Sequence, residues 1–266
     1  MPEGPEIRRA ADDVEKALKE RTVKRIDFAF NRLKPYEKTL QGSLVTGVDT
    51  KGKAMLTRFD NGWTIYSHNQ LYGKWIIRPA FDYPNTDRQL RMAIHNNTSS
   101  ALLYSASDIE VMPDEEMTEH PFIKKAGPDI LSEKVTAEKL LAQITHPAFY
   151  KRKWASLLLD QSFIAGIGNY LRSEILFVSG IYPELRPKDC SQSRLVTVAE
   201  TTIHLMHQAY EHNGITLDLS LKNRNVDERH WVFNREERPC YVCTSPIEKR
   251  QSASRRLYYC PNCQQK

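Results

Sequence analysis

The first half of the chain opens with one amphipathic helical pattern. Apolar residues recur three or four positions apart and charged residues fill the positions between them, as in an α-helix with one buried face. We therefore expect a single helix that packs against the core formed by the following segments. Its apolar positions are Ile7, Ala10, Ala11, Val14, Ala17 and Leu18.

From Val23 the pattern changes to alternation of apolar and polar residues, which is typical of β-strands with one buried face. Turn-forming residues such as Asp60-Asn61-Gly62 and Asn96-Asn97-Thr98 separate the apolar runs, so neighbouring strands are expected to pair as antiparallel hairpins. The pattern predicts a β-sandwich or open barrel with the first helix packed against it. The predicted strands are 26–30, Leu44–Thr50, Ala54–Phe59, Trp63–Ser67, Leu90–Ile94 and Ala101–Tyr104.

The strand pattern stops near Met112, and a helical period follows a stretch rich in Pro and Gly. We predict an α+β fold with an N-terminal domain over residues 1–124, a linker over 125–134, a helical domain over 135–232 and a four-cysteine module over 233–266. The pair Asn213-Gly214 is a suitable C-cap for the last helix. The predicted helices are Thr136–Ile144, Trp154–Phe163, Asn169–Val178 and Ser193–His212.

Composition indicates an ordinary globular protein, with 40% hydrophobic and 27% charged residues. Neither an apolar run long enough to span a membrane nor a signal-peptide core is present, so we expect a cytoplasmic protein. The formal net charge of +5 permits an anionic partner without requiring one. Basic residues gather at Lys151-Arg152-Lys153 and in the last 32 residues, which suggests two separate contacts with a polyanion.

Four of the five cysteines lie near the end of the chain in two Cys-x-x-Cys pairs, Cys240 with Cys243 and Cys260 with Cys263. This spacing predicts a closed tetrahedral site for one structural Zn²⁺. Chance spacing or a redox pair are the alternatives. The metal would supply the folding energy of a short ribbon that presents basic residues, whereas Cys190 is expected to be a packing residue.

Two further segments carry candidate chemistry. Ala165-Gly166-Ile167-Gly168 precedes a predicted helix whose N-terminus can bind phosphate, although such glycines commonly form only a turn. Removal of Met1 would expose the amine of Pro2, and an α-amine is a nucleophile at neutral pH because its pKa of about 7.7 to 8.0 lies well below that of lysine. Glu3 and Glu6 can move protons there or can simply stabilise a helix start.

Taken together, Met-Pro-Glu-Gly-Pro-Glu at the start, the Gly-Ile-Gly-Asn-Tyr turn and the four-cysteine ribbon resemble the formamidopyrimidine-DNA glycosylase and endonuclease VIII superfamily. The segments Ser67–Gly73 and Leu103–Asp108 look like its endonuclease VIII branch, which acts on oxidised pyrimidines. The resemblance implies a catalytic β-sandwich domain, a helix-two-turns-helix domain ending in a zinc ribbon, and DNA in the cleft between them. It also implies a monomeric enzyme of base excision repair, associated with the nucleoid when acting.

The resemblance assigns roles to particular residues. It implies that Pro2 is the Schiff-base nucleophile, that Glu3 is the acid for base departure, and that Lys53 and Arg255 assist β- and δ-elimination. Without it, Lys53 would pass as a solvated turn residue.

The resemblance also implies the DNA contacts. Gln70, Leu71 and Tyr72 would fill the gap left by the extruded nucleotide, with a buried loop packed on Trp75 as the alternative. Asn169 would bind phosphate. Lys125 stands where the family has a DNA-contacting arginine, and segment 214–234 departs from the family pattern.

These observations predict a bifunctional DNA glycosylase and abasic-site lyase that acts on double-stranded DNA containing oxidised bases or abasic sites. Two other readings stay open. One is a purine-directed glycosylase with the same chemistry, and the other is a zinc-ribbon protein that binds DNA without catalysis. An inactive paralogue is disfavoured because Pro2, Glu3, Lys53 and Arg255 are all present.

Overall fold

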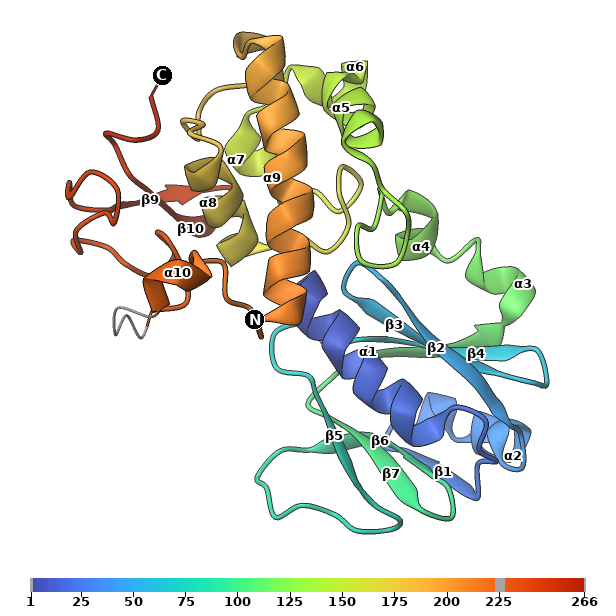
Figure 1. Ribbon diagram of the computed structural model, residues 1–266. Coiled ribbons are helices and arrows are strands. Elements are labelled where there is room, and N and C mark those ends of the chain that lie inside the picture. The colour runs from blue at the N-terminus through green and yellow to red at the C-terminus, as the bar shows by residue number, and fades with distance from the viewer. Residues whose placement is uncertain (1, 223–227, 266) are drawn as a thin grey trace. The chain divides into compact units, whose positions relative to one another are not determined.

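A computed structural model describes residues 2–222 and 228–265 of the chain (Figure 1). The described residues form two compact units, one made of residues 6–125 with Pro2 and the other of residues 126–265 with Glu3, Gly4 and Pro5. No helix within the described ranges combines the length and apolarity that a membrane span requires.

Two four-stranded antiparallel sheets build the first unit, in the orders β1-β6-β7-β5 and β2-β3-β4-β8. Apolar side chains of both sheets and of helix α1 (Gly4–Leu18) form one buried cluster, so the predicted sandwich with a packed helix is confirmed. Short helices complete the unit: η1 (Asn31–Leu33), α2 (Pro35–Leu40), α3 (Asp114–Met117) and α4 (Pro121–Lys125). The strands are β1 (Arg25–Phe28), β2 (Val45–Lys51), β3 (Ala54–Phe59), β4 (Trp63–His68), β5 (Lys74–Pro79), β6 (Leu90–His95), β7 (Ser99–Tyr104) and β8 (Asp108–Pro113).

Strands β5 and β8 were absent from the sequence prediction. In β5 the apolar residues Trp75, Ile76 and Ile77 are consecutive rather than alternating, and the strand ends at Pro79. Both strands pair along their whole length, β5 with β7 and β8 with β4. Pairing with a neighbouring strand therefore determines that these two segments are strands. The order of apolar and polar residues within each segment does not.

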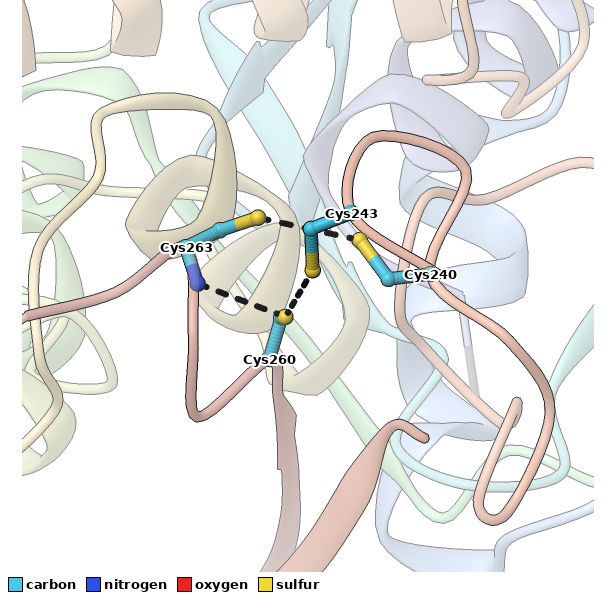
Figure 2. Close-up of side chains that lie close together, drawn as sticks. All are labelled: Cys240, Cys243, Cys260 and Cys263. Carbon is cyan, nitrogen blue, oxygen red and sulfur yellow. Dashed lines mark hydrogen bonds between the residues drawn. The ribbon is translucent and has the colours of Figure 1, made fainter. Parts of the chain in front are cut away.

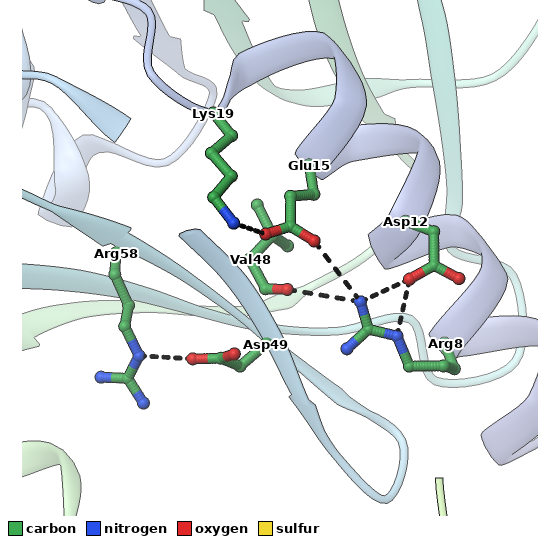
Figure 3. A network of polar contacts seen from close by, with 7 residues as sticks. All are labelled: Arg8, Asp12, Glu15, Lys19, Val48, Asp49 and Arg58. Carbon is green, nitrogen blue, oxygen red and sulfur yellow. Dashed lines mark hydrogen bonds and ion pairs between the residues drawn. The ribbon is translucent and has the colours of Figure 1, made fainter. Parts of the chain in front are cut away.

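A polar network fastens α1 to the sheet that contains β2 (Figure 3). Arg8 bonds Asp12 through Nε at 2.8 Å, and its Nη2 lies 3.5 Å from the carbonyl oxygen of Val48 in β2. On the same side of the helix, Nζ of Lys19 forms an ion pair with Oε1 of Glu15 at 2.8 Å. Exposed ion pairs of this kind contribute little stability. The contact between Arg8 and Val48 therefore only adds to the apolar packing that holds α1 in the sandwich.

The second unit packs α5, α8 and α9 around one apolar core. The hairpin of β9 and β10 belongs to it, because Leu257 and Tyr259 are buried in the same core. Its elements are α5 (Ala137–Thr145), α6 (Pro147–Tyr150), α7 (Trp154–Leu157), α8 (Asn169–Val178), η2 (Pro187–Asp189), α9 (Gln192–Glu211), α10 (Leu219–Lys222), β9 (Glu248–Ser252) and β10 (Arg255–Tyr259).

The predicted helix over Trp154–Phe163 is wrong beyond Leu157. The Asp160 carboxylate accepts hydrogen bonds from the backbone N–H and the hydroxyl of Ser162, at 2.8 and 2.7 Å, which offers the backbone a turn in place of a helix. Gln161 then donates to the carbonyl oxygen of Ile167 and accepts from the N–H of Gly166, so its side chain closes the turn that leads to α8.

The end of α9 follows the prediction. Asn213 and Gly214 both have positive φ, and the N–H of Gly214 donates to the carbonyl oxygen of Ala209 at 2.7 Å. This pattern is a left-handed C-cap.

Candidate functional site

The carboxylate of Glu3 is buried at the N-terminus of α8. Its side chain accepts hydrogen bonds from the backbone N–H groups of Gly168 (2.7 Å), Tyr170 (2.8 Å) and Leu171 (3.3 Å), and the residue is 1% exposed. Backbone N–H groups at a helix start have no partner within the helix and form the positive end of its dipole. The site therefore stabilises a negative charge on Glu3 and fixes both carboxylate oxygens.

This arrangement corrects two expectations. The backbone of the glycine turn does face an anion, but at the N–H groups of Gly168, Tyr170 and Leu171 that anion is the carboxylate of Glu3 and not a phosphate. Stabilisation of its own helix start also does not account for these contacts of Glu3, because the three donors lie about 165 residues further along the chain.

Glycine at position 168 is a steric requirement of the Glu3 site. A Cβ atom on Gly168 would lie 2.4 Å from Glu3 Cδ and 2.6 Å from Glu3 Oε1. The adjoining backbone is equally close, since the N–H of Gly4 donates to the carbonyl oxygen of Gly166 at 2.8 Å. Gly166 itself has φ of 95°, a conformation that side chains disfavour.

Arg172 is the site residue that sequence reasoning missed. It is fully buried and donates to the side-chain oxygen of Asn169 at 2.6 Å and to the carbonyl oxygens of Ala155, Ser252 and Arg256 at 2.9, 3.2 and 3.0 Å. It thus joins the start of α8 to the β9–β10 hairpin. An arginine three residues after Asn169, in a helix whose other residues are mostly apolar, was the available signal.

Arg172 also orients the candidate phosphate ligand Asn169. Because an arginine only donates, the oxygen of the Asn169 amide must face it and the NH₂ group must point the other way. Burial and the charge of Arg255 together lower the pKa of Arg172 to about 10, against the opposing effect of the charge of Glu3. Of the predicted residues, Asn169 therefore bonds this buried arginine directly, and the charges of Glu3 and Arg255 act on it.

Arg255 is exposed as the first residue of β10. The turn before it contains Ala253 and Ser254, both with positive φ of 50° and 59°. Two such residues in succession are uncommon outside hairpin turns. They form the turn between β9 and β10, and so they determine the backbone direction at Arg255.

Three further candidate residues, Pro2, Lys53 and Lys125, lie in the first unit. Pro2 is half-buried in the segment that precedes α1, and Lys53 is half-buried in the turn between β2 and β3. The charge of Lys53 contributes to a lowered pKa of His68, so these two side chains are electrostatic neighbours. Lys125 is exposed at the end of α4.

The loop between β4 and β5 carries large apolar groups in solvent. Leu71 is 51% and Tyr72 69% exposed, and Gln70 is exposed as well. Trp75 is buried in the sandwich core. The alternative of a buried loop packed on Trp75 is therefore wrong.

The four clustered cysteines converge on one point (Figure 2). Their Sγ atoms all lie within 4.8 Å of one another, with Cys240 and Cys263 at 3.8 Å and Cys243 and Cys260 at 3.4 Å. A tetrahedral Zn²⁺ with bonds of about 2.3 Å separates its sulfur ligands by about 3.8 Å. The four thiols are thus in position to hold a metal ion and leave no room for a water ligand.

The protonation of these thiols also fits a cation site. Hydrogen bonds from Asn262 and Ser245 lower the pKa of Cys243 to about 6, whereas burial raises the pKa of Cys260 and Cys263. Four thiolates this close repel one another, so all of them can ionise only around a cation. Cys190 packs against the helical core at a distance from this group, as expected.

A second buried carboxylate organises the divergent segment 214–234, of which residues 223–227 lie outside the described part of the chain. Glu174 is fully buried and accepts hydrogen bonds from the hydroxyl of Thr216 and from the N–H groups of Trp231, Val232 and Phe233, at 2.6 to 2.9 Å. Both ends of the divergent segment are therefore tied to α8.

Comparison with known proteins gives matches along most of the chain. Residues 1–106 match the formamidopyrimidine-DNA glycosylase N-terminal domain, and residues 126–220 match the formamidopyrimidine-DNA glycosylase H2TH domain. The Endonuclease 8 proteins of Salmonella arizonae and Salmonella enteritidis are both 44% identical over 264 residues, which is 99% of this chain and all of theirs.

Solved structures with the same fold include Lactococcus lactis Fpg in complex with DNA containing N7-benzyl-Fapy-dG, with a TM-score of 0.84 and 20% identity over the whole of both chains. The same protein bound to abasic-site DNA gives a TM-score of 0.83 at 20% identity, over 99% of this chain and all of that one. At this identity the structural similarity establishes the fold.

Proposed function

The chain belongs to the formamidopyrimidine-DNA glycosylase and endonuclease VIII family, and from this membership we propose how its residues carry out the reaction. It is a DNA glycosylase and abasic-site lyase of base excision repair. Oxidised pyrimidines are the substrate class that fits the Endonuclease 8 proteins, which match this chain over its full length.

In the proposed reaction Pro2 is the nucleophile. Its secondary amine, exposed once Met1 is removed, attacks C1′ of the deoxyribose and displaces the base. The C1′–O4′ bond of the sugar then breaks, O4′ takes up a proton with the assistance of Glu3, and the electron pair of the amine completes a C=N bond. The resulting iminium cation cannot lose a proton from nitrogen, so it withdraws electrons and promotes the β- and δ-eliminations that nick the strand. Lys53 and Arg255 assist these two eliminations.

Glu3 is the proposed acid for base departure, and its environment is the observation that carries the proposal. A carboxylate directly after the prolyl residue is buried and held by three backbone N–H groups. This holds both oxygens in fixed positions next to Pro2 in the chain. The same donors favour the ionised form of Glu3, so in this proposal Glu3 first takes up a proton from the attacking amine of Pro2 and then passes it on to assist base departure.

We assign DNA binding to residues in three separate segments of the chain. Asn169 and Lys125 contact backbone phosphates, and the residues Gln70, Leu71 and Tyr72, here named the wedge loop, enter the duplex where the nucleotide leaves it. The exposure of Leu71 and Tyr72 supports this use, because large exposed apolar groups favour insertion into a base stack. One structural Zn²⁺ on the four clustered cysteines would stabilise the ribbon that carries Arg255.

Borohydride trapping tests the proposal. The protein is incubated with a duplex containing thymine glycol, reduced, and examined for a covalent adduct mapped by mass spectrometry. We expect the adduct on Pro2, and we expect it to vanish when a two-residue extension precedes Pro2. The same extension placed after Lys266 is the matched control and should leave trapping unchanged.

The two rival functions give different results in the same assay. A purine-directed glycosylase would be trapped on 8-oxoguanine duplexes in preference to thymine glycol. A DNA-binding protein without catalysis would bind both duplexes and yield no adduct. An adduct mapped to a lysine would overturn the role of Pro2.

A further inference from the structure

We propose that His68, Arg88 and Ser107 are positioning residues that hold the wedge loop in its working shape before DNA is bound. The inference rests on the proposed function, because a rigid exposed wedge is useful only to a protein that extrudes a nucleotide. None of the three residues needs to touch the reacting atoms.

The wedge loop is in a conformation that requires outside support. Gln70 has φ of 51°, which is unfavourable for a side-chain-bearing residue, and it precedes two large side chains that are mostly in solvent. The loop also closes tightly, since the N–H of Gly73 donates to the carbonyl oxygen of Asn69 at 2.7 Å and a Cβ on Gly73 would lie 2.5 Å from that oxygen. Strain of this kind persists where surrounding groups enforce it.

Three side chains from three different segments enforce it here. The N–H of Gln70 donates to Nδ1 of His68 at the end of β4, at 3.0 Å. The hydroxyl of Ser107, between β7 and β8, donates to the side-chain oxygen of Gln70 at 2.7 Å. Nη1 of Arg88, between β5 and β6, donates to the carbonyl oxygen of Tyr72 at 2.7 Å. The wedge loop is therefore held at both of its ends.

The chemistry of each contact suits a permanent brace. His68 accepts a hydrogen bond at Nδ1 and must be neutral there. Burial lowers its pKa, the charge of Lys53 lowers it further, and Asp108 opposes this, so the neutral form prevails at neutral pH. The contacts of His68 and Arg88 use backbone atoms of the loop, and that of Ser107 uses the side chain of Gln70. None of the three contacts uses the side chain of Leu71 or Tyr72.

A braced wedge favours extrusion of the nucleotide. Ordering a flexible loop on binding costs conformational entropy, and a loop already in its bound shape avoids this cost. Loss of a brace should therefore slow the step in which the wedge loop replaces a base, and it should not affect steps that need no wedge.

The test compares Arg88→Met and Ser107→Ala with the unaltered protein. Single-turnover base removal from a thymine glycol duplex should slow by about three- to tenfold, the equivalent of one lost hydrogen bond. Cleavage of a single-stranded abasic oligonucleotide should stay within about twofold, and Ser107→Thr should restore the parent rate. Arg78→Met removes another exposed arginine, one that pairs with Asp82, and is the matched control.

Amide hydrogen exchange of the peptide covering residues 68–74, measured without DNA, reports the bracing directly. We expect faster exchange in Arg88→Met and Ser107→Ala than in the unaltered protein. The inference would be overturned if both variants kept the hydrogen-exchange rate of the unaltered protein and also its rate of base removal from the duplex. If the unaltered protein forms no adduct with DNA, the proposed function fails, while the exchange experiment still decides whether the loop is braced.

Discussion

The backbone N–H of Gly168 donates a 2.7 Å hydrogen bond to Oε2 of Glu3, and a methyl group on Gly168 would lie 2.4 Å from Glu3 Cδ. The contact joins residues 165 positions apart. The buried carboxylate can therefore occupy this place only because position 168 has no side chain.

Gly168→Ala should impair base removal while the protein stays folded. Overpacking of this size typically costs about 1 to 3 kcal/mol, and here it is relieved most easily by displacement of the Glu3 side chain. We expect single-turnover base removal to fall by at least about tenfold, and the melting temperature to fall by a few degrees. Gly47→Ala, where a Cβ meets nothing within 4 Å, is the control. Equal activity of the two variants would contradict the steric argument.

Glu3→Gln should separate the two chemical steps. The amide keeps one acceptor oxygen and turns an NH₂ group toward backbone donors, so it can neither supply a proton nor satisfy all three N–H groups. We expect base removal from intact lesions to fall by about 10² to 10⁴-fold, with much of the cleavage at preformed abasic sites retained. Glu6→Gln is the matched control. Equal losses on both substrates would refute the assigned role.

Periodic patterns allowed much of this fold to be predicted from sequence. The boundaries of α8 and β3 match the predicted Asn169–Val178 and Ala54–Phe59, and both segments bury the apolar residues on which the prediction rested. The pattern failed at residues 158–163, where side chains of Asp160 and Gln161 replace backbone helix bonds. Such local competition is not visible in hydrophobic periodicity.

The candidate site was predictable only in part. The cysteine spacing and the N-terminal hexapeptide pointed to Cys240, Pro2 and Glu3, but nothing near Glu3 in the sequence indicated that its partners belong to α8. Arg172 was missed for the same reason, since its importance comes from carbonyl oxygens of Ala155, Ser252 and Arg256. Long-range polar contacts have no period, so sequence reasoning cannot detect them without a structure.

Glu174→Gln should destabilise the helical unit. The carboxylate accepts four hydrogen bonds with no solvent exposure, and an amide with a single acceptor oxygen leaves buried donors unsatisfied. The expected loss is about 2 to 4 kcal/mol of unfolding free energy, measured by urea denaturation. The exposed Glu200→Gln on the neighbouring helix α9 is the control and should change stability by less than about 0.5 kcal/mol.

Removal of the metal should unfold the ribbon and weaken the helical core. Leu257 and Tyr259 of the ribbon are buried among the helices, so loss of the ribbon exposes that core. Elemental analysis should find one zinc per chain, and a strong chelator or Cys260→Ser should lower the melting temperature and reduce DNA affinity. Cys190→Ser should retain the zinc. A chelator-treated protein with an unchanged melting temperature would show that the four thiols need no metal.

A buried histidine should make the β-sandwich sensitive to acid. His95 is fully buried, with Nδ1 2.6 Å from the hydroxyl of Ser100 and Nε2 2.9 Å from the hydroxyl of Tyr83. Burial lowers the pKa of His95 below its ordinary value, while the nearby charge of Asp27 raises it and that of Arg25 lowers it. The neutral imidazole is therefore the form that the folded protein prefers.

The sign of the effect follows from proton uptake. Below about pH 6.5 the unfolded chain protonates this histidine before the folded protein does, so the free energy of unfolding contributed by His95 is present above that pH and decreases as the pH falls through the lowered pKa of the folded state. The slope attributable to one proton cannot exceed about 1.4 kcal/mol per pH unit. Urea denaturation between pH 7.5 and about 5 should show this slope in the unaltered protein and a shallower one in His95→Gln. Since His207→Gln removes a solvent-facing histidine of α9, it should keep the parent slope, and identical slopes in all three proteins would mean that burial of His95 does not control its protonation.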